Sequence, residues 1–158
     1  YNRRRGYYPG AAVLYTNYGV AAFQMGNEDV AQKMFEYADE IYQAFDEFSE
    51  YPIALAYLAY FDAKKQEMSS ARQRIRKALA LCDRFLSPWW KGVTIYMMWK
   101  IRADFGDRQG IGELADLWPG SEKEHCEWCL SYLHQIEWRE ETQQIEQALQ
   151  KLQQGAPA

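Results

Sequence analysis

The sequence predicts an all-α fold, a helical solenoid of about three helix hairpins followed by a C-terminal capping helix or helices. The first observation is a pattern of large and small residues whose spacing puts them on the facing sides of two antiparallel helices. It is formed by Tyr15, Tyr18, Gly19, Ala22, Ala31, Phe35 and Ala38. The second is its return forty residues later, in Leu55, Leu58, Ala59, Asp62, Ala71, Ile75 and Ala78. Only the change from Ala22 to Asp62 alters the size class and character of a position. Self-similarity at such a period is typical of stacked helical repeats.

The composition fits one packed helical domain. A chain of 158 residues can bury a sizeable core without a disulfide or a metal, and 48% of these residues are apolar. The 12 Tyr, 7 Phe and 6 Trp supply the bulky side chains that helix packing uses. The formal net charge of -4 argues against a phosphate-binding surface spread over the fold, so we expect no direct nucleic-acid binding by this domain.

Cysteine content and hydropathy indicate the compartment. Three cysteines form an odd count without a disulfide framework, and the sequence contains neither a signal-peptide core nor a membrane-spanning run. We therefore expect a cytoplasmic protein with no membrane partner. Because the sequence begins at Tyr1 rather than Met, we expect a segment of a longer protein, and a processed, secreted chain stays the open alternative.

The chain divides into a lead-in (1–10), a helical domain (11–153) and a frayed tail (154–158). The lead-in contains Arg3, Arg4 and Arg5 and ends in the turn dipeptide Pro9-Gly10. We interpret it as a linker. The alternative is a basic connection to a nucleic-acid-binding domain outside this sequence.

The first hairpin comprises helices over 11–25 and 29–47, separated by a break at Gly26-Asn27. The second comprises helices over 52–65 and 71–86, with Pro52 in a first turn and Ser69 or Ser70 as the cap of the second helix.

The third hairpin fits the pattern poorly. Its first helix is expected over 89–105, after Ser87-Pro88, and its second is a short helix over 108–117. Trp99 falls where a small residue is expected and Ala115 where a large one is, so the packing must differ. The remaining residues, 121–153, are expected to form the cap, either one helix or two that are broken near 139–142.

The first hairpin resembles the tetratricopeptide repeat (TPR). In that family the first helix of a unit carries an aromatic residue or Leu, then Leu, Gly or Ala, and Tyr, and the second carries Ala, a large residue and Ala. The first repeat matches at the seven positions given above, with Gly26 at the turn, and the second at all but Asp62. The resemblance covers residues 12–118 and implies a TPR-like α-α superhelix. The family's unit is about 34 residues, so the forty-residue unit looks more like those of maltose-type transcription activators and peptide-sensing bacterial regulators.

The resemblance implies that the first helix of each unit lines a concave groove. The groove residues implied are Thr16, Asn17, Val20, Phe23 and Gln24 in the first unit, Ala56, Tyr57, Tyr60 and Lys64 in the second, and Tyr96, Met97, Lys100 and Asp104 in the third. Those we expect to bind a partner are Asn17, Phe23, Gln24, Tyr57, Tyr60, Lys64, Tyr96 and Lys100. The alternative is that half of these tyrosines complete the core. The basic clamp with which some relatives grip a C-terminal carboxylate is not reproduced, because Val93 and Met97 replace its last basic pair.

Other candidate chemistry is sparse. The residue types of His125, Cys126, Cys129 and His134 suit zinc, but they lie in one helical pattern in which His134 rotates away, so we expect no metal and keep zinc as the alternative. No nucleotide-binding glycine loop, nucleophile elbow or zinc-protease helix is present, so we expect neither an enzyme nor a cofactor. The tryptophan and methionine clusters Trp89-Trp90 and Met97-Met98-Trp99 are expected in the core, with an apolar small-molecule pocket as the alternative.

The function we expect is a non-catalytic scaffold module that binds a protein or peptide on its concave face. Two alternatives stay open. One is a ligand- or peptide-sensing regulatory domain of a bacterial transcription regulator, and the other is a small adaptor or chaperone complete in itself. A homodimer is also expected, because the first hairpin has no cap and leaves an apolar end.

Overall fold

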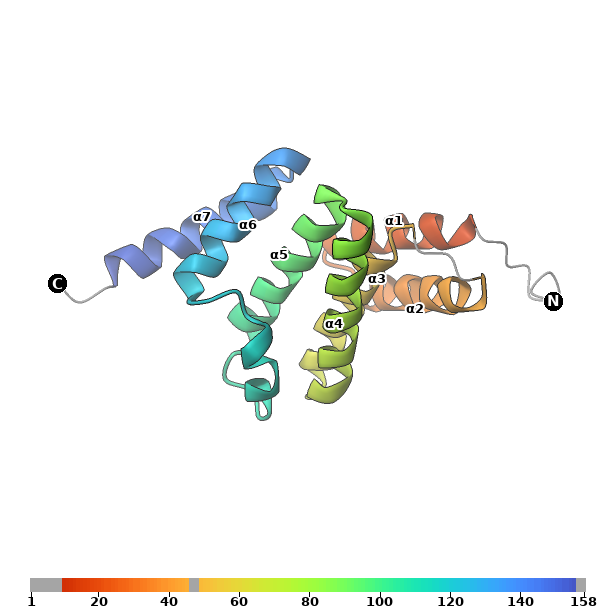
Figure 1. Ribbon diagram of the computed structural model, residues 1–158, viewed down its shortest axis with the longest axis horizontal. Coiled ribbons are helices and arrows are strands. Elements are labelled where there is room, and N and C mark those ends of the chain that lie inside the picture. The colour runs from red at the N-terminus through yellow and green to blue at the C-terminus, as the bar shows by residue number, and fades with distance from the viewer. Residues whose placement is uncertain (1–9, 46–48, 156–158) are drawn as a thin grey trace.

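The fold is all-helical. The computed structural model describes residues 10–45 and 49–155, and within these ranges all regular secondary structure is helical (Figure 1). The elements are α1 (Ala11–Gln24), α2 (Glu28–Phe45), α3 (Tyr51–Lys64), α4 (Met68–Phe85), α5 (Pro88–Phe105), the 3-10 helix η2 (Ile111–Leu117), α6 (Glu122–Ile136) and α7 (Arg139–Gln154). They follow one another from the N-terminal to the C-terminal end of the molecule. None of the described helices is long and apolar enough to cross a membrane. The expected linker, apart from Gly10, and tail residues 156–158 lie outside the described ranges.

The forty-residue period appears in the helix bounds. Helices α1 and α3 have 14 residues each, α2 and α4 have 18 each, and every bound of the second hairpin lies forty residues after its counterpart in the first. The faces repeat as well, since both members of each of three pairs have no exposed surface: Ala31 and Ala71, Phe35 and Ile75, Ala38 and Ala78. The period in the sequence therefore corresponds to two hairpins of equal size.

Glycines permit the first hairpin to close. Gly26 ends α1 with φ +84°, a left-handed conformation that glycine adopts without strain, as the expected break requires. A Cβ atom at Gly19 would lie 2.8 Å from the Phe35 ring, so α1 and α2 approach too closely there for a larger residue. Tyr18, in contrast, is 60% exposed, and its expected place between the helices was wrong.

The third hairpin differs from its expected form. Residues 111–117 form a 3-10 helix that packs on α4, whereas α5 packs against α6, so the long partner of α5 comes later in the chain than expected. Glycine disfavours a regular helix in this stretch, and Gly110 has φ +84°. The Arg72 guanidinium binds the Asp116 carboxylate in two places and fixes η2 to α4.

The start of α4 differs from the expected one, whereas the start of α5 agrees with it. Helix α4 begins at Met68, and neither Ser69 nor Ser70 caps it; the Ser69 hydroxyl donates instead to Glu113 in η2 (3.1 Å). The expected start of α5 is confirmed, because the Ser87 hydroxyl accepts the Trp90 N–H (3.3 Å) and Pro88 occupies the first turn. The last stretch is broken at Glu137 and Trp138, so that α6 and α7 are separate helices.

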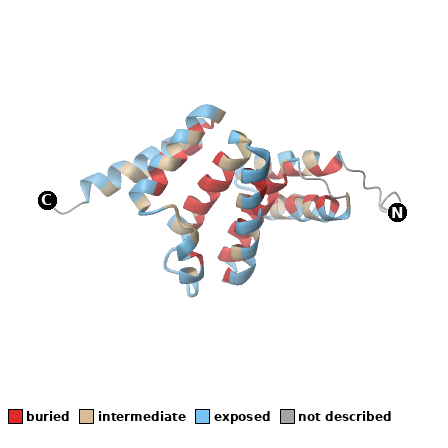
Figure 2. Ribbon diagram, viewed as in Figure 1, coloured by how far each residue is buried: buried red, intermediate tan, exposed pale blue. Residues whose placement is uncertain are grey.

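Helix α3 lies at the centre of the molecule. All residues from Tyr51 to Ala63 are buried, and so is the middle of α5, from Gly92 to Trp99 (Figure 2). A helix that is apolar on every side requires partners on every side. Helices α2, α4 and α5 all contact α3, and the exposed residues of α2 and α4 form their outer faces. Helix α3 is therefore the central element of the core.

Candidate binding cavity

Six of the eight expected binding residues line a single cavity of about 270 Å³, which we call the inner cavity. They come from three helices: Phe23 and Gln24 from α1, Tyr57 and Tyr60 from α3, and Tyr96 and Lys100 from α5. The remaining lining residues are Glu28, Asp104, Glu140, Glu141 and Gln144. First helices of the three hairpins thus contribute one wall and the start of α7 contributes another.

Other expected groove residues lie elsewhere. Asn17 is exposed on α1 and does not line the cavity, and Lys64 is exposed and pairs with the lining residue Glu28 (2.9 Å). The expected groove positions of Thr16, Ala56 and Met97 were wrong, because all three are buried in the core. The Thr16 hydroxyl is hydrogen-bonded to the Tyr42 hydroxyl (2.9 Å), so it connects α1 to α2 instead of facing a partner.

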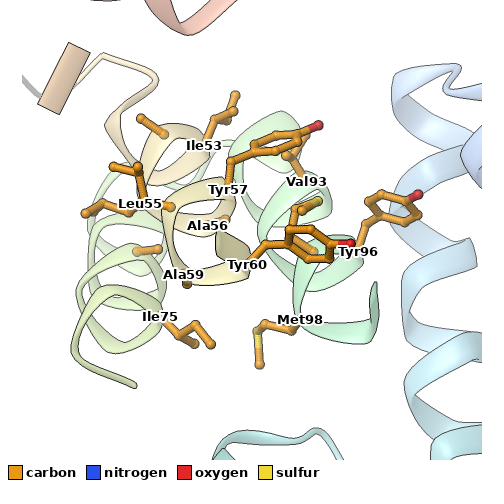
Figure 3. Close-up of a cluster of buried hydrophobic side chains, with 14 of the residues drawn as sticks. Ile53, Leu55, Ala56, Tyr57, Ala59, Tyr60, Ile75, Val93, Tyr96 and Met98 are labelled. Atoms are coloured by element: carbon orange, nitrogen blue, oxygen red, sulfur yellow. The ribbon is translucent and has the colours of Figure 1, made fainter. Parts of the chain in front are cut away.

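Aromatic residues line the inner cavity, among them Tyr57, Tyr60 and Tyr96, whose side chains Figure 3 shows. The Phe23 ring meets those of Tyr57 and Tyr60 edge to face, with centroids 5.1 Å and 5.4 Å apart. Tyr57 is stacked on Phe35 of the core (4.6 Å) and Tyr60 packs on Phe105 (4.9 Å). Aromatic pairs at such distances add to the stability gained from burial. The same rings therefore support the core and shape the cavity.

The tyrosine hydroxyls differ in their partners. Tyr60 donates to Asp104 (2.8 Å) and Tyr96 donates to Gln144 (2.6 Å). The Tyr57 hydroxyl forms no hydrogen bond with any residue in the described ranges, although only 1% of the residue is exposed. Burial raises the pKa of all three phenols, and nearby carboxylates raise it further: Asp104 next to Tyr60, and Glu141 near Tyr57 and Tyr96. All three hydroxyls therefore stay protonated at neutral pH.

The rim of the inner cavity is rich in carboxylates. Asp104 forms an ion pair with Lys100 (3.3 Å) and accepts a hydrogen bond from Tyr60, and Glu141 accepts one from Gln24 (3.1 Å). The bond between Gln24 and Glu141 joins residues 117 positions apart and fixes the first turn of α7 to the end of α1. The cavity is therefore closed on one side by the C-terminal helix.

Sequence reasoning missed the contribution of α7. Ile145 and Leu149 marked that helix as amphipathic, but the pattern does not say which surface the apolar face covers. Ile145 has no exposed surface, and its neighbours Glu141 and Gln144 reach Gln24 and Tyr96. The only signal was the unusual position of Glu141, one helical turn before a buried residue on the same face.

The histidine and cysteine cluster is a packing feature of α6. The His125 Nε2 lies 3.2 Å from the Ile95 carbonyl oxygen, and the Cys129 thiol donates to the same oxygen (3.6 Å). Burial lowers the pKa of His125 to about 4, so its ring is neutral at pH 7. His134 is exposed, and within the described ranges no three His, Cys, Asp or Glu residues come together as metal ligands.

The tryptophan and methionine clusters also belong to the packing. Met97, Met98 and Trp99 are buried core residues, and Trp89 and Trp90 are half-buried against the core. None of these five residues lines the inner cavity. A larger and more open depression of about 400 Å³ lies between the consecutive helices α6 and α7, lined by residues such as His134 and Glu146. The inner cavity, in contrast, is lined by residues of five helices, α1, α2, α3, α5 and α7.

Comparison with known proteins gives no family for this chain, so a function has to be argued from the site. The chain matches no protein-family model, no curated protein and no solved structure. The class that the structure defines is an all-helical protein with an aromatic, acidic cavity between its hairpins and its last helix.

Proposed function

We propose that this protein is a non-catalytic, TPR-like module that binds a peptide or a segment of a partner protein in its inner cavity. The observation that supports this most is convergence: Phe23, Tyr57 and Tyr96, from three different helices, line one cavity. First helices of successive units line the groove in the family that the sequence resembles. Tyrosine is also well suited to an interface that must face water when it is empty.

The size of the cavity limits how much of a peptide can enter it. Its volume of about 270 Å³ lies below the ~300 Å³ at which pockets for drug-sized ligands begin. One or two side chains of a peptide fit such a space, with the rest of the peptide running over the rim. Because aromatic contacts within the core hold the tyrosines, little side-chain entropy is lost when a partner binds.

A selection with a phage-displayed library of random short peptides tests the proposal. We expect peptides to be enriched on the wild-type protein and to be lost when the cavity is blocked. Gln144 is exposed on the rim, and the three natural cysteines are buried, so Gln144→Cys can be labelled with a bulky maleimide. The matched control is Glu127→Cys with the same label, at an exposed position outside the cavity lining.

The selection and labelling experiment has three distinguishable outcomes. Loss of the selected peptides on labelled Gln144→Cys, with retention on labelled Glu127→Cys, supports binding in the cavity. Equal binding to both labelled variants would place the peptide site elsewhere. Failure to enrich any peptide on the wild-type protein would contradict the proposal as a whole.

A second proposal is a ligand- or peptide-sensing regulatory domain of a bacterial transcription regulator. Its support is the closure of the cavity by α7, because the Gln24–Glu141 bond connects the first hairpin to the last helix. A ligand that displaced this bond would change how the two ends of the chain are held together. The reading frame that encodes the chain tests this idea: a DNA-binding domain in the same frame would favour it, and a frame without one would exclude it.

A further inference from the structure

The inner cavity holds more negative charge than its basic neighbours neutralise. Of its four carboxylates, Glu28 pairs with Lys64 at 2.9 Å and Asp104 pairs with Lys100 at 3.3 Å. Among the residues that the structure describes, Glu140 and Glu141 have no basic nitrogen within 4.0 Å. The N-terminal end of α7 carries only about half a unit of positive charge. The α7 side of the cavity therefore remains negative.

A second, independent observation concerns the Tyr57 hydroxyl. Tyr57 is 1% exposed and lines the cavity, and its hydroxyl has no hydrogen-bond partner in the described ranges. Figure 3 shows the hydroxyl ends of Tyr57, Tyr60 and Tyr96 directed to the same side. Because Tyr57 lines the cavity, a ligand that enters it can supply the missing hydrogen-bond partner. An N–H group within the cavity would donate to the Tyr57 oxygen.

The protein already places one cation at this surface. The Lys100 ammonium lies 5.8 Å from the centre of the Tyr60 ring and contacts Asp104. Aromatic faces attract cations most strongly where water is excluded, as it is at buried tyrosines. The cavity thus combines aromatic walls, two uncompensated carboxylates and one unpaired hydroxyl oxygen.

We propose that the inner cavity binds a cationic side chain of the peptide partner, the ammonium of lysine or the guanidinium of arginine. Glu140 and Glu141 would accept its N–H groups, the Tyr57 oxygen would accept another, and the rings of Phe23 and Tyr96 would flank its aliphatic stem. The same charges repel a carboxylate or a phosphate. This inference rests on the proposed function and specifies which peptides the module takes.

The composition of the peptides that the random library yields tests it. We expect one position to be occupied by Lys or Arg in peptides selected on the wild-type protein. A selected peptide should bind Glu141→Gln about tenfold more weakly, because an ion pair is replaced by a neutral hydrogen bond. Glutamine keeps the size of the side chain and can still accept the Gln24 bond, so we expect the fold to be retained, as circular dichroism would show.

Glu127→Gln is the matched control, since it removes the same charge at an exposed site outside the cavity lining, and it should leave the affinity unchanged. Replacing the basic residue of the peptide by norleucine should abolish the difference between wild type and Glu141→Gln. Enriched peptides without a basic position, or equal binding to wild type and Glu141→Gln, would overturn this inference and leave the peptide-binding proposal standing. A library that yields no enriched peptide would overturn both.

Discussion

At the scale of single residues, Tyr57 and Tyr60 both pack in the core and line the inner cavity. A substitution that removes the ring disturbs both roles at once. Each tyrosine is at least 95% buried, and each ring packs on Phe23. Tyr57 also packs on Phe35, and Tyr60 packs on Phe61 and Phe105. Both residues also line the inner cavity. A change at either position therefore tests binding only if the ring is kept.

Two variants at Tyr60 separate the contribution of the ring from that of the hydroxyl. Tyr60→Ala should lower the free energy of unfolding by about 3–5 kcal/mol, because it leaves a space among three aromatic rings. Tyr60→Phe should cost only about 1–3 kcal/mol, through the lost bond to Asp104. Urea titrations followed by circular dichroism measure both. Equal stabilities of Tyr60→Ala and wild type would show that Tyr60 is not a core residue.

At the scale of elements, the Asp62–Arg74 ion pair connects α3 to α4. Asp62 is the residue that breaks the repeat pattern, and its carboxylate lies 2.8 Å and 2.9 Å from the Arg74 guanidinium. Burial raises the pKa of Asp62 to about 6, although the charge of Arg74 acts in the opposite direction. The desolvation of this carboxylate thus outweighs its ion pair.

The pH dependence of stability follows from that shift. The folded protein holds the Asp62 proton up to about pH 6, whereas the unfolded chain releases it near the ordinary Asp pKa of 3.8. The folded state therefore binds more protons in this window, and the contribution of Asp62 to stability is full below it and is lost as the pH rises through it.

Comparison with Asp62→Asn isolates the effect. The free energy of unfolding of the wild type, relative to Asp62→Asn, should fall by about 1–3 kcal/mol between pH 4 and pH 6. Denaturant titrations at a series of pH values measure this difference. The opposite slope would mean that the ion pair, and not burial, dominates at Asp62. The difference between the proteins is used because His125, with a pKa of about 4, has the opposite pH dependence in both.

The helices could be predicted from the sequence to different degrees. The first two hairpins were predictable because packing at Ala31, Phe35 and Ala38 repeats at Ala71, Ile75 and Ala78, and local spacing determines such faces. The third was not, because η2 packs on α4 through Arg72 and Asp116, a contact that no local pattern reveals. The aromatic side of the cavity followed from the resemblance, whereas its acidic side depends on the docking of α7.

At the scale of the whole molecule, the first hairpin ends in an exposed apolar stripe. Leu14 and Tyr18 of α1 are 61% and 60% exposed, and Met25, the residue directly after α1, is 84% exposed. Their spacings of four and seven residues place them on one side of the helix. Tyr18 and Met25 also line a depression with Val30. Self-association through this end, expected from the sequence, stays a prediction.

A mass measurement tests self-association. We expect light scattering after size exclusion to give twice the monomer mass of 18.6 kDa for the wild-type chain. Tyr18→Glu should restore the monomer, because a charge is then placed in the apolar stripe, and it should not unfold the protein, since Tyr18 is exposed. A wild-type monomer at all concentrations would exclude the dimer.

The location of the binding site is tested most directly by mapping a selected peptide onto the protein by NMR. With a chain of 18.6 kDa, backbone amide shifts can be followed residue by residue during a titration. We expect the largest changes at Gln24, Tyr57, Tyr96 and Glu141, around the inner cavity. Changes confined to the outer faces of α2 and α4, with the cavity residues unperturbed, would contradict the proposed site.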